Sequence, residues 1–257
     1  MLDFLNHVYV LTLKNKDHEP LHQRYQALFA SRYKLFEVEG TPKNANGGQI
    51  GSSVWKIIQH NETDATALDI TKNHTEMIRD AHSLGYENVL FLEDDALFTP
   101  LSKQKEERLK DWMISAQNKW DIFFMGYCPW PVLTSFMVTR DIVRVFTPVC
   151  AHAYVLNRNG MEKMLMFLET PENRQHHFDK IFNLIPGFRK YAAFPMISFQ
   201  ETGPALYTKA VDQLGVTLPF LTMCRVLEWV SVMIPVLILA VLVLLGVRYF
   251  SATKQKK

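Results

Sequence analysis

The chain has 257 residues, of which 48% are hydrophobic and 12% aromatic, and its 28 basic residues are nearly balanced by 26 acidic ones. This much apolar surface is enough to bury a core, so a disordered chain is not expected. Four of the basic residues lie in the last ten positions, and the remainder therefore has 24 basic against 26 acidic residues, a balance of −2. A nucleic-acid partner is not expected, because the excess positive charge lies in the tail and not on the domain.

The predicted elements alternate between strands and helices. Apolar runs predict strands at 8–13, around 34–38, at 89–92 and at 121–125, with a β-like segment at 151–156. Helical periodicity predicts helices at 21–30, 69–84, 102–118 and 161–168. This alternation indicates a single α/β domain with a mostly parallel central sheet.

The segment 226–247 is predicted to be one C-terminal transmembrane helix. Residues 229–247 carry no charge, and nineteen helical residues span about 28 Å, close to the hydrocarbon thickness of a bilayer. A buried core helix is the alternative, but a small domain rarely encloses a helix that is apolar on every face. The expected division is a domain over 1–207, a linker or packing tail over 208–225, the transmembrane helix, and a basic tail over 248–257.

The side of the membrane on which the domain lies is predicted from both ends of the chain. The N-terminus lacks a basic region followed by an apolar stretch and a cleavage site, so the domain is expected in the cytosol. The cations after the span favour the opposite orientation, because basic flanks prefer the cytosolic side. The three cysteines, Cys128, Cys150 and Cys224, have no CxxC spacing. They therefore indicate a reducing compartment and not a disulfide framework or a zinc site.

An acidic triplet, Glu93-Asp94-Asp95, directly follows the buried strand at 89–92. Adjacent carboxylates repel one another, and a divalent cation relieves this repulsion because Mg²⁺ and Mn²⁺ prefer oxygen ligands. In open α/β sheets, ligands bind beyond the carboxyl ends of the strands. The triplet therefore predicts a site for a metal and a phosphate-bearing substrate, with a solvated acidic turn as the alternative.

The segment NHTEMIRDAHSLGYENVLFLEDDA resembles the core of glycosyltransferase family 25, the lipopolysaccharide and procollagen galactosyltransferase group. In that family, a helix with a polar-His pair precedes a strand that ends in Glu-Asp-Asp. Further similar segments occur in the family's order and cover about residues 7–207: VYVLTLKNKDHEPLHQRY, WDIFFMG, AHAYVLNRNGMEKML, HHFDK and YAAFPMISFQ. The resemblance implies the nucleotide-sugar-binding GT-A fold, a nucleotide-diphosphate-sugar donor bridged by Mn²⁺ or Mg²⁺, and inversion at the sugar carbon.

Metal and proton-transfer roles are expected for four of the residues. Asp95 is the first choice as a metal ligand. Glu93 lies on the same side by strand alternation and is expected to contact the ribose, the metal or its bound water. His152 is expected near the donor or the metal, or else as a hydrogen-bonded core histidine. Asp179 matches the family's late acidic position and is expected to be the base that accepts the acceptor's proton, with a helix cap or surface salt bridge as the alternative.

The remaining expected site residues would bind the donor. Thr12, Leu13 and Asn15 follow the first strand, where the family binds the nucleotide base. Arg24 is expected at a phosphate, although a helix-surface cation is the alternative. Asn73 and His74 match the polar-His pair and either line the donor site or cap and pack the start of their helix. Asp94 is assigned to the donor side and points away from Glu93.

The function expected from these residues is a membrane-anchored, metal-dependent, inverting glycosyltransferase. It would move a sugar from a nucleotide-diphosphate donor, UDP-linked, to a glycan, protein or lipid acceptor. One alternative is a tail-anchored interaction protein on an inactive transferase fold. Another is a different metal-dependent phosphoryl- or nucleotidyl-transferring enzyme on a similar sheet.

Overall fold

The structure is a computed structural model that describes residues 2, 4–5, 7–14, 18–38, 65–128, 135–200 and 220–254. The strands are β1 (His7–Leu13), β2 (Tyr33–Val38), β3 (Asn88–Glu93), β4 (Ala96–Phe98), β5 (Ile122–Cys128), β6 (Ser135–Thr139), β7 (Ile142–Val145), β8 (Val149–Asn157), β9 (Lys190–Ala193) and β10 (Ser198–Gln200). The helices are α1 (Glu19–Phe29), α3 (Ala65–Ser83), α4 (Lys103–Ser115), α5 (Arg158–Phe167), α6 (Phe178–Leu184) and α8 (Phe220–Lys254). Short 3-10 turns, η1 and η2, cover Gln117–Lys119 and Pro171–Gln175.

The central sheet has eight strands in the order β2-β1-β3-β8-β5-β9-β7-β6. When the pairings are followed across the sheet, six strands run in one direction and only β8 and β7 run in the other. The predicted α/β fold with mostly parallel strands is therefore confirmed. A second, two-stranded ribbon pairs β4 with β10 in antiparallel fashion.

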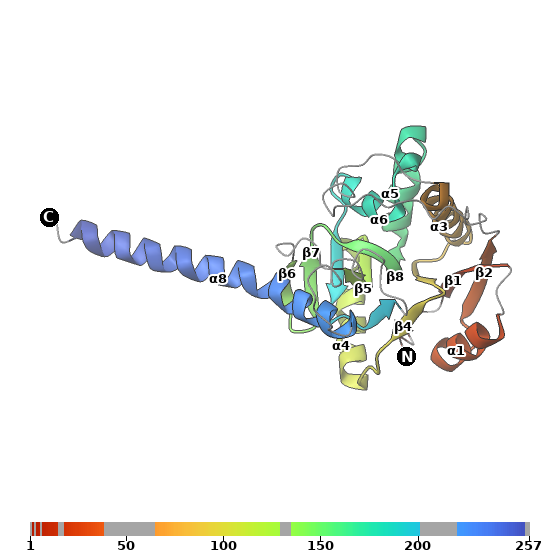
Figure 1. Cartoon of the computed structure of the whole chain (residues 1–257), viewed down its shortest axis with the longest axis horizontal. Helices are drawn as coiled ribbons and strands as arrows, with labels where there is room; N and C mark the ends of the chain where they lie inside the picture. Colours follow the sequence, from red (N-terminus) through yellow and green to blue (C-terminus); the bar gives the residue numbers. More distant parts are fainter. Residues whose placement is uncertain are drawn as a thin grey trace.

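Helices cover both faces of this sheet (Figure 1). One core cluster joins the sheet to α3, α5 and α6, and a second joins it to α1 and α4. Strand alternation divides β3 between them, because Phe91 faces the first cluster while Leu90 and Leu92 face the second. All three side chains are fully buried, as expected for a strand covered on both faces.

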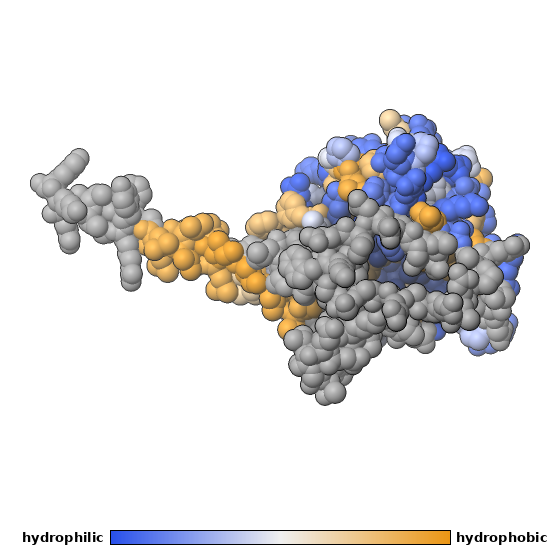
Figure 2. All heavy atoms as spheres, turned by 45° about the horizontal axis from the view of Figure 1, so that its top comes forward, coloured by the Kyte–Doolittle hydropathy of each residue, from blue (hydrophilic) through white to orange (hydrophobic). Residues whose placement is uncertain are grey.

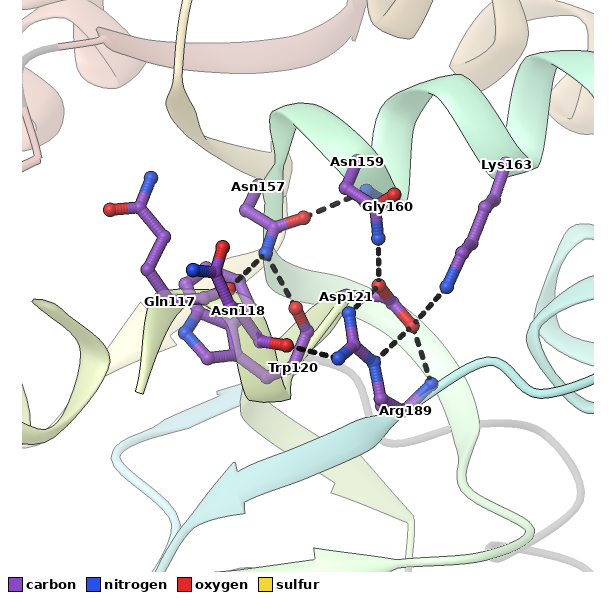
Figure 3. Close-up of polar contacts among 9 residues, drawn as sticks. All are labelled: Gln117, Asn118, Trp120, Asp121, Asn157, Asn159, Gly160, Lys163 and Arg189. Atoms are coloured by element: carbon purple, nitrogen blue, oxygen red, sulfur yellow. Dashed lines mark hydrogen bonds and ion pairs between the residues drawn. The ribbon is translucent and has the colours of Figure 1, made fainter. Parts of the chain in front are cut away.

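A buried polar network fixes the strand ends opposite the acidic triplet (Figure 3). The Asp121 carboxylate is fully buried just before β5, and it accepts hydrogen bonds from Arg189, Lys163 and Asn159. Burial works to raise the pKa of Asp121, but the bonds from Arg189 and Lys163 outweigh it and hold that pKa below its usual range. The network therefore ties β5, α5 and the approach to β9 together through an ionised aspartate.

The structure corrects the expectation that the cysteines are reduced, since Cys150 is in a disulfide bond. CxxC spacing reports only pairs close in sequence, and the nearest other cysteine, Cys128, lies 22 residues from Cys150, so the spacing gave no signal. Several observed elements lie outside the predicted ones, among them β4 and the β6–β7 hairpin. The helix α8 begins at Phe220, inside the range expected to be a linker.

The helix α8 is, among the described residues, the one helix long and apolar enough to cross a membrane, by length and composition, over Arg225–Leu245. Its first turns pack on the domain: the backbone N–H of Met196 donates to Glu228 Oε1 at 2.6 Å, and the rings of Trp229 and Phe194 meet edge-on at 4.8 Å. From residue 236 to residue 245 every side chain is exposed. Val232 is the last buried residue among the described side chains of α8, so the helix leaves the domain surface between Met233 and residue 236 (Figure 1).

Candidate functional site

The acidic triplet lies at the carboxyl end of β3 and in the turn to β4, as the sequence predicts. Residues from β1 and α1 hold this turn in place. Thr12 Oγ1 donates to Asp94 Oδ2 at 2.8 Å, and Arg24 Nη1 donates to the Asp94 carbonyl at 3.2 Å. The Tyr25 hydroxyl donates to the Glu93 carbonyl at 3.1 Å. The structure therefore brings Thr12, Arg24 and Asp94 together, and the first two position the acidic turn.

The Glu93 carboxylate is held by two side chains from other elements. His74 Nε2 lies 3.3 Å from Glu93 Oε1, and Gln200 Nε2 donates to Glu93 Oε2 at 3.4 Å. Because an ionised carboxylate only accepts hydrogen bonds, His74 donates through Nε2. Burial works to raise the pKa of Glu93, but the bond from His74, with the charges of His74 and His152 and the bond from Gln200, lowers it. Glu93 is therefore the ionised carboxylate of the site.

His74 is fully buried and is oriented from both sides. Its Nδ1 lies 2.9 Å from the Tyr154 hydroxyl, and its ring stacks on Phe178 with centroids 4.1 Å apart. The helix α3 begins at Ala65, so the alternative that Asn73 and His74 cap its start is wrong. Asn73, next to His74 on α3, is partly exposed.

Asp179 lies in the first turn of α6, directly after Phe178. Burial, followed by the nearby charge of Glu93, raises the pKa of Asp179 to about 7, against an ordinary value of 3.8. The backbone N–H groups of Cys150 and Ala151 donate to it and act in the opposite direction. The two carboxylates of the site therefore have different protonation behaviour: Glu93 stays ionised, and Asp179 exchanges its proton near neutral pH.

His152 lies on β8, one step beyond the last ladder pair between Leu92 and Ala153, and so opposite Glu93. It is 3% exposed, and neither ring nitrogen makes a hydrogen bond of good geometry with the described part of the chain. Burial lowers the pKa of His152, although the charge of Glu93 and the backbone of Ser198 oppose this shift. His152 is therefore a buried histidine opposite Glu93, and its expected place near the donor or the metal stays a prediction.

Gly126 on β5 allows His152 and the β10 backbone to meet. A Cβ atom at this glycine would lie 2.3 Å from His152 Nε2 and 2.2 Å from the Ser198 carbonyl oxygen, and no other residue fits at that approach. The register between β5 and β8 shifts at this glycine. Sequence reasoning gave no role to Gly126, Tyr154 or Gln200, although all three lie in the segments that carry the resemblance.

The other expected site residues lie as follows. Leu13 ends β1, and its carbonyl accepts from His18 Nε2 at 2.8 Å. Asn15 lies outside the described residues. Asp95 is partly exposed in the turn after Glu93. Among the described residues, no three His, Cys, Asp or Glu side chains form a ready-made metal site. Mg²⁺ commonly binds through one or two carboxylates plus substrate phosphates, and Asp95 with Glu93 fits that smaller requirement.

No protein-family profile matches the chain, and no curated protein matches it. Among solved structures, the chain is similar to a glycosyltransferase involved in the glycosylation of the major capsid of PBCV-1, with 11% identity, 82% of this chain and 100% of that one covered, and a TM-score of 0.40. It is also similar to A197 from STIV, with 11% identity, 72% and 81% covered, and a TM-score of 0.40. UDP-glucose pyrophosphorylase complexed with UDP-glucose is similar at 8% identity, with 81% of each chain covered and a TM-score of 0.39. Overlaps this loose carry no argument about function.

Proposed function

We propose that the chain is a membrane-anchored, inverting glycosyltransferase that moves a sugar from a nucleotide-diphosphate donor, UDP-linked, to a glycan, protein or lipid acceptor. The observation that carries this proposal is the pair of unlike carboxylates, Glu93 and Asp179. Glu93 ends β3, and Asp179 accepts from the backbone at the start of β8. Glu93 is ionised, whereas the pKa of Asp179 is raised to about 7. A carboxylate with a pKa near the working pH suits general base catalysis.

In the proposed reaction, Asp179 accepts the proton of the acceptor hydroxyl as that oxygen attacks the sugar carbon. The bond from this carbon to the donor's phosphate oxygen breaks, and the nucleoside diphosphate leaves with the electron pair. A Mn²⁺ or Mg²⁺ held by Asp95 and Glu93 would supply Lewis-acid stabilisation of the leaving diphosphate. His74 and Tyr154 keep Glu93 oriented, and Thr12 with Arg24 keeps the acidic turn in place.

The test is a donor screen on the full chain in detergent, with release of nucleoside diphosphate measured with and without Mn²⁺ or Mg²⁺. Asp95→Ala is expected to abolish metal-dependent donor binding while the domain stays folded. Asp179→Asn is expected to retain donor binding and to lose transfer. Asp111→Ala, an exposed carboxylate on α4, is the matched control and is expected to behave as wild type. Normal turnover of the Asp95 variant would reject the metal assignment.

A second candidate function is an interaction protein on an inactive transferase fold. It is favoured by the observation that Glu93 and Asp94 already have protein partners, as the carboxylates of a structural acidic turn would. Silence of the screen across all common nucleotide sugars, without ligand-induced stabilisation, would favour this candidate over catalysis.

The membrane topology belongs to the proposal as well. The sequence-based expectation places the domain in the cytosol, whereas the Cys150 disulfide is typical of an oxidising compartment. Protease treatment of sealed microsomes separates the two. Digestion of the domain supports the cytosolic side, and protection supports the lumenal side.

A further inference from the structure

The outer edge of the central sheet presents an apolar surface to solvent. We call it the β6–β7 apolar surface; it consists of Phe136, Met137 and Val138 on β6 and of Phe146 just after β7. Their exposed fractions are 52%, 43%, 46% and 41%. Because β6 is the last strand of the sheet, side chains on both of its faces reach solvent. An exposed apolar edge strand invites aggregation unless something covers it.

This surface adjoins the apolar helix. The strand β6 lies beside α8 where the helix leaves the domain (Figure 1). Apolar surface continues from the free part of α8 onto the adjoining face of the domain (Figure 2). On α8 itself, Trp229 is 50% exposed at the junction, and Met233 is 44% exposed. Tryptophan at such a junction is typical of the layer between hydrocarbon and water.

The free part of α8 is too short to cross a bilayer alone. Glu228, Ser231 and Val232 are buried against the domain, so the free apolar run extends from Met233 to Val247, before Arg248. Fifteen helical residues span about 22 Å, whereas the hydrocarbon core is about 30 Å thick. If α8 spans the membrane, the bilayer must reach about 8 Å further along the docked turns, to the level at which β6 lies.

The charges around the surface fit an anionic membrane. Arg140 is highly exposed, with 78% of its side chain accessible. Arg144 is also exposed and lies over the Phe146 ring, 5.3 Å from its centroid. Asp141, the one acidic residue between 135 and 147, is buried. It pairs with Arg108 at 2.5 Å, and Arg140 Nε lies 3.8 Å from it. Apolar side chains flanked by cations are the composition that interfacial binding to anionic lipid uses.

We propose that the β6–β7 apolar surface inserts into the interfacial layer of the bilayer that α8 spans, with Arg140 and Arg144 at the lipid headgroups. The inference rests on the membrane anchoring in the proposed function but not on the chemistry of the site. It makes the domain a second membrane contact, so that the domain lies against the bilayer and does not swing freely on α8.

The test places a tryptophan in the surface of the full chain, reconstituted in phosphatidylcholine vesicles with and without phosphatidylserine. Phe136→Trp is compared with Met166→Trp, an equally conservative change at a 63% exposed position on α5, which lies away from α8 (Figure 1). The emission that each variant adds to that of the five native tryptophans is measured with lipids brominated near their headgroups. Val138→Trp is the second variant if Phe136→Trp does not fold.

The added emission at position 136 is expected to shift to the blue and to lose most of its intensity in brominated lipid, while the emission added at 166 is unchanged. Phosphatidylserine is expected to strengthen the quenching. The double variant Arg140→Gln and Arg144→Gln is expected to remove the extra quenching that phosphatidylserine causes. Equal emission from both positions, in chains that resist alkaline carbonate, overturns the inference but leaves the anchor intact. Extraction of the chain by carbonate would overturn both the membrane anchoring and the insertion of this surface. The chemistry of the site is tested separately, by release of nucleoside diphosphate. A further outcome is that the emission at position 136 is not quenched and that the chain forms dimers which Phe136→Glu abolishes. That outcome overturns the inference and assigns the surface to contact with a second copy of the chain.

Discussion

Replacing Asp179 by asparagine is expected to stabilise the folded chain at alkaline pH while abolishing transfer. Burial and the charge of Glu93 raise the pKa of Asp179 to about 7 from an ordinary value of 3.8. Each pKa unit corresponds to about 1.4 kcal/mol of free energy. Because Asp179 is partly exposed, keeping this carboxylate ionised in the folded chain costs at most about 4 kcal/mol above pH 7.

The sign follows from which state holds the proton more tightly. Because the pKa of Asp179 is higher in the folded chain, wild-type stability falls as pH rises from about 4 to about 7 and stays low above that. Asparagine carries no charge, but its NH₂ group replaces one carboxylate oxygen and cannot accept a hydrogen bond. The N–H groups of Cys150 and Ala151 must therefore share the one remaining oxygen, which costs about 1 kcal/mol. The expected net gain is about 1 to 3 kcal/mol at pH 8 and none at pH 4.

Thermal unfolding of both chains in detergent at the two pH values measures this difference, and each kcal/mol shifts the midpoint by about 2 to 4 °C. Asp121→Asn is the matched control. Its carboxylate has a lowered pKa through Arg189 and Lys163, so its loss is expected to destabilise by about 3 to 5 kcal/mol at pH 8. If Asp179→Asn were equally destabilising at pH 4 and pH 8, the reasoning about its burial would be wrong.

Two further substitutions probe the packing of the site. Gly126→Ala places a Cβ atom 2.2 Å from the Ser198 carbonyl oxygen and is expected to cost about 1 to 3 kcal/mol by overpacking; Gly187→Ala, whose Cβ atom would meet open space at φ +68°, should cost only the backbone strain of about 1 kcal/mol. Equal midpoints in thermal unfolding for the two alanine variants would contradict the clash. Tyr154→Phe leaves Nδ1 of the buried His74 without its hydroxyl partner and is expected to cost about 1 to 3 kcal/mol. It should also lower turnover more than donor affinity, as initial-rate kinetics would show, and unchanged kinetics would remove Tyr154 from the positioning of Glu93.

The central strands and their helices were predictable because each is long enough to show its period. Phe91 and its neighbours form an uninterrupted apolar run, and α3 shows an apolar stripe over several turns. The β6–β7 hairpin was missed because Phe136, Met137 and Val138 do not alternate with polar residues, and alternation is the signal of a half-buried strand. That same departure leaves apolar side chains on both faces of β6, which is the surface that we propose lies against the membrane.

The site was predictable only where one motif contains the residues. Glu93 and His74 lie within a single recognisable segment, and Asp179 matches a later one. Gln200 and Gly126 reach the site through pairings that sequence does not reveal: β10 pairs with β4 just after the acidic turn, and β5 changes register beside His152. Such contacts depend on how distant strands are ordered, which local patterns do not encode.

The unlike behaviour of Glu93 and Asp179 gives a test that a purely structural role would not pass. Two neighbouring carboxyls whose environments separate their pKa values are the usual arrangement for dividing charge stabilisation from proton transfer. The charge of Glu93 is the second cause, after burial, of the raised pKa of Asp179. Glu93→Gln removes that charge while keeping an oxygen that can accept from His74. The pKa of Asp179 is therefore expected to fall below 7 but, because burial remains, to stay above its ordinary 3.8.

In the pH profile of kcat/KM for sugar transfer, wild type is expected to rise through a midpoint near pH 7, because the base must lose its proton before it can act. Residual turnover in Glu93→Gln should show that midpoint at lower pH. Asp111→Ala, which alters an exposed carboxylate on α4, supplies the profile of a variant with the site unchanged. A midpoint that stays near 7 in Glu93→Gln would mean that the titrating group is not Asp179 or does not sense Glu93. In either case, the division of labour between the two carboxylates would have to be abandoned.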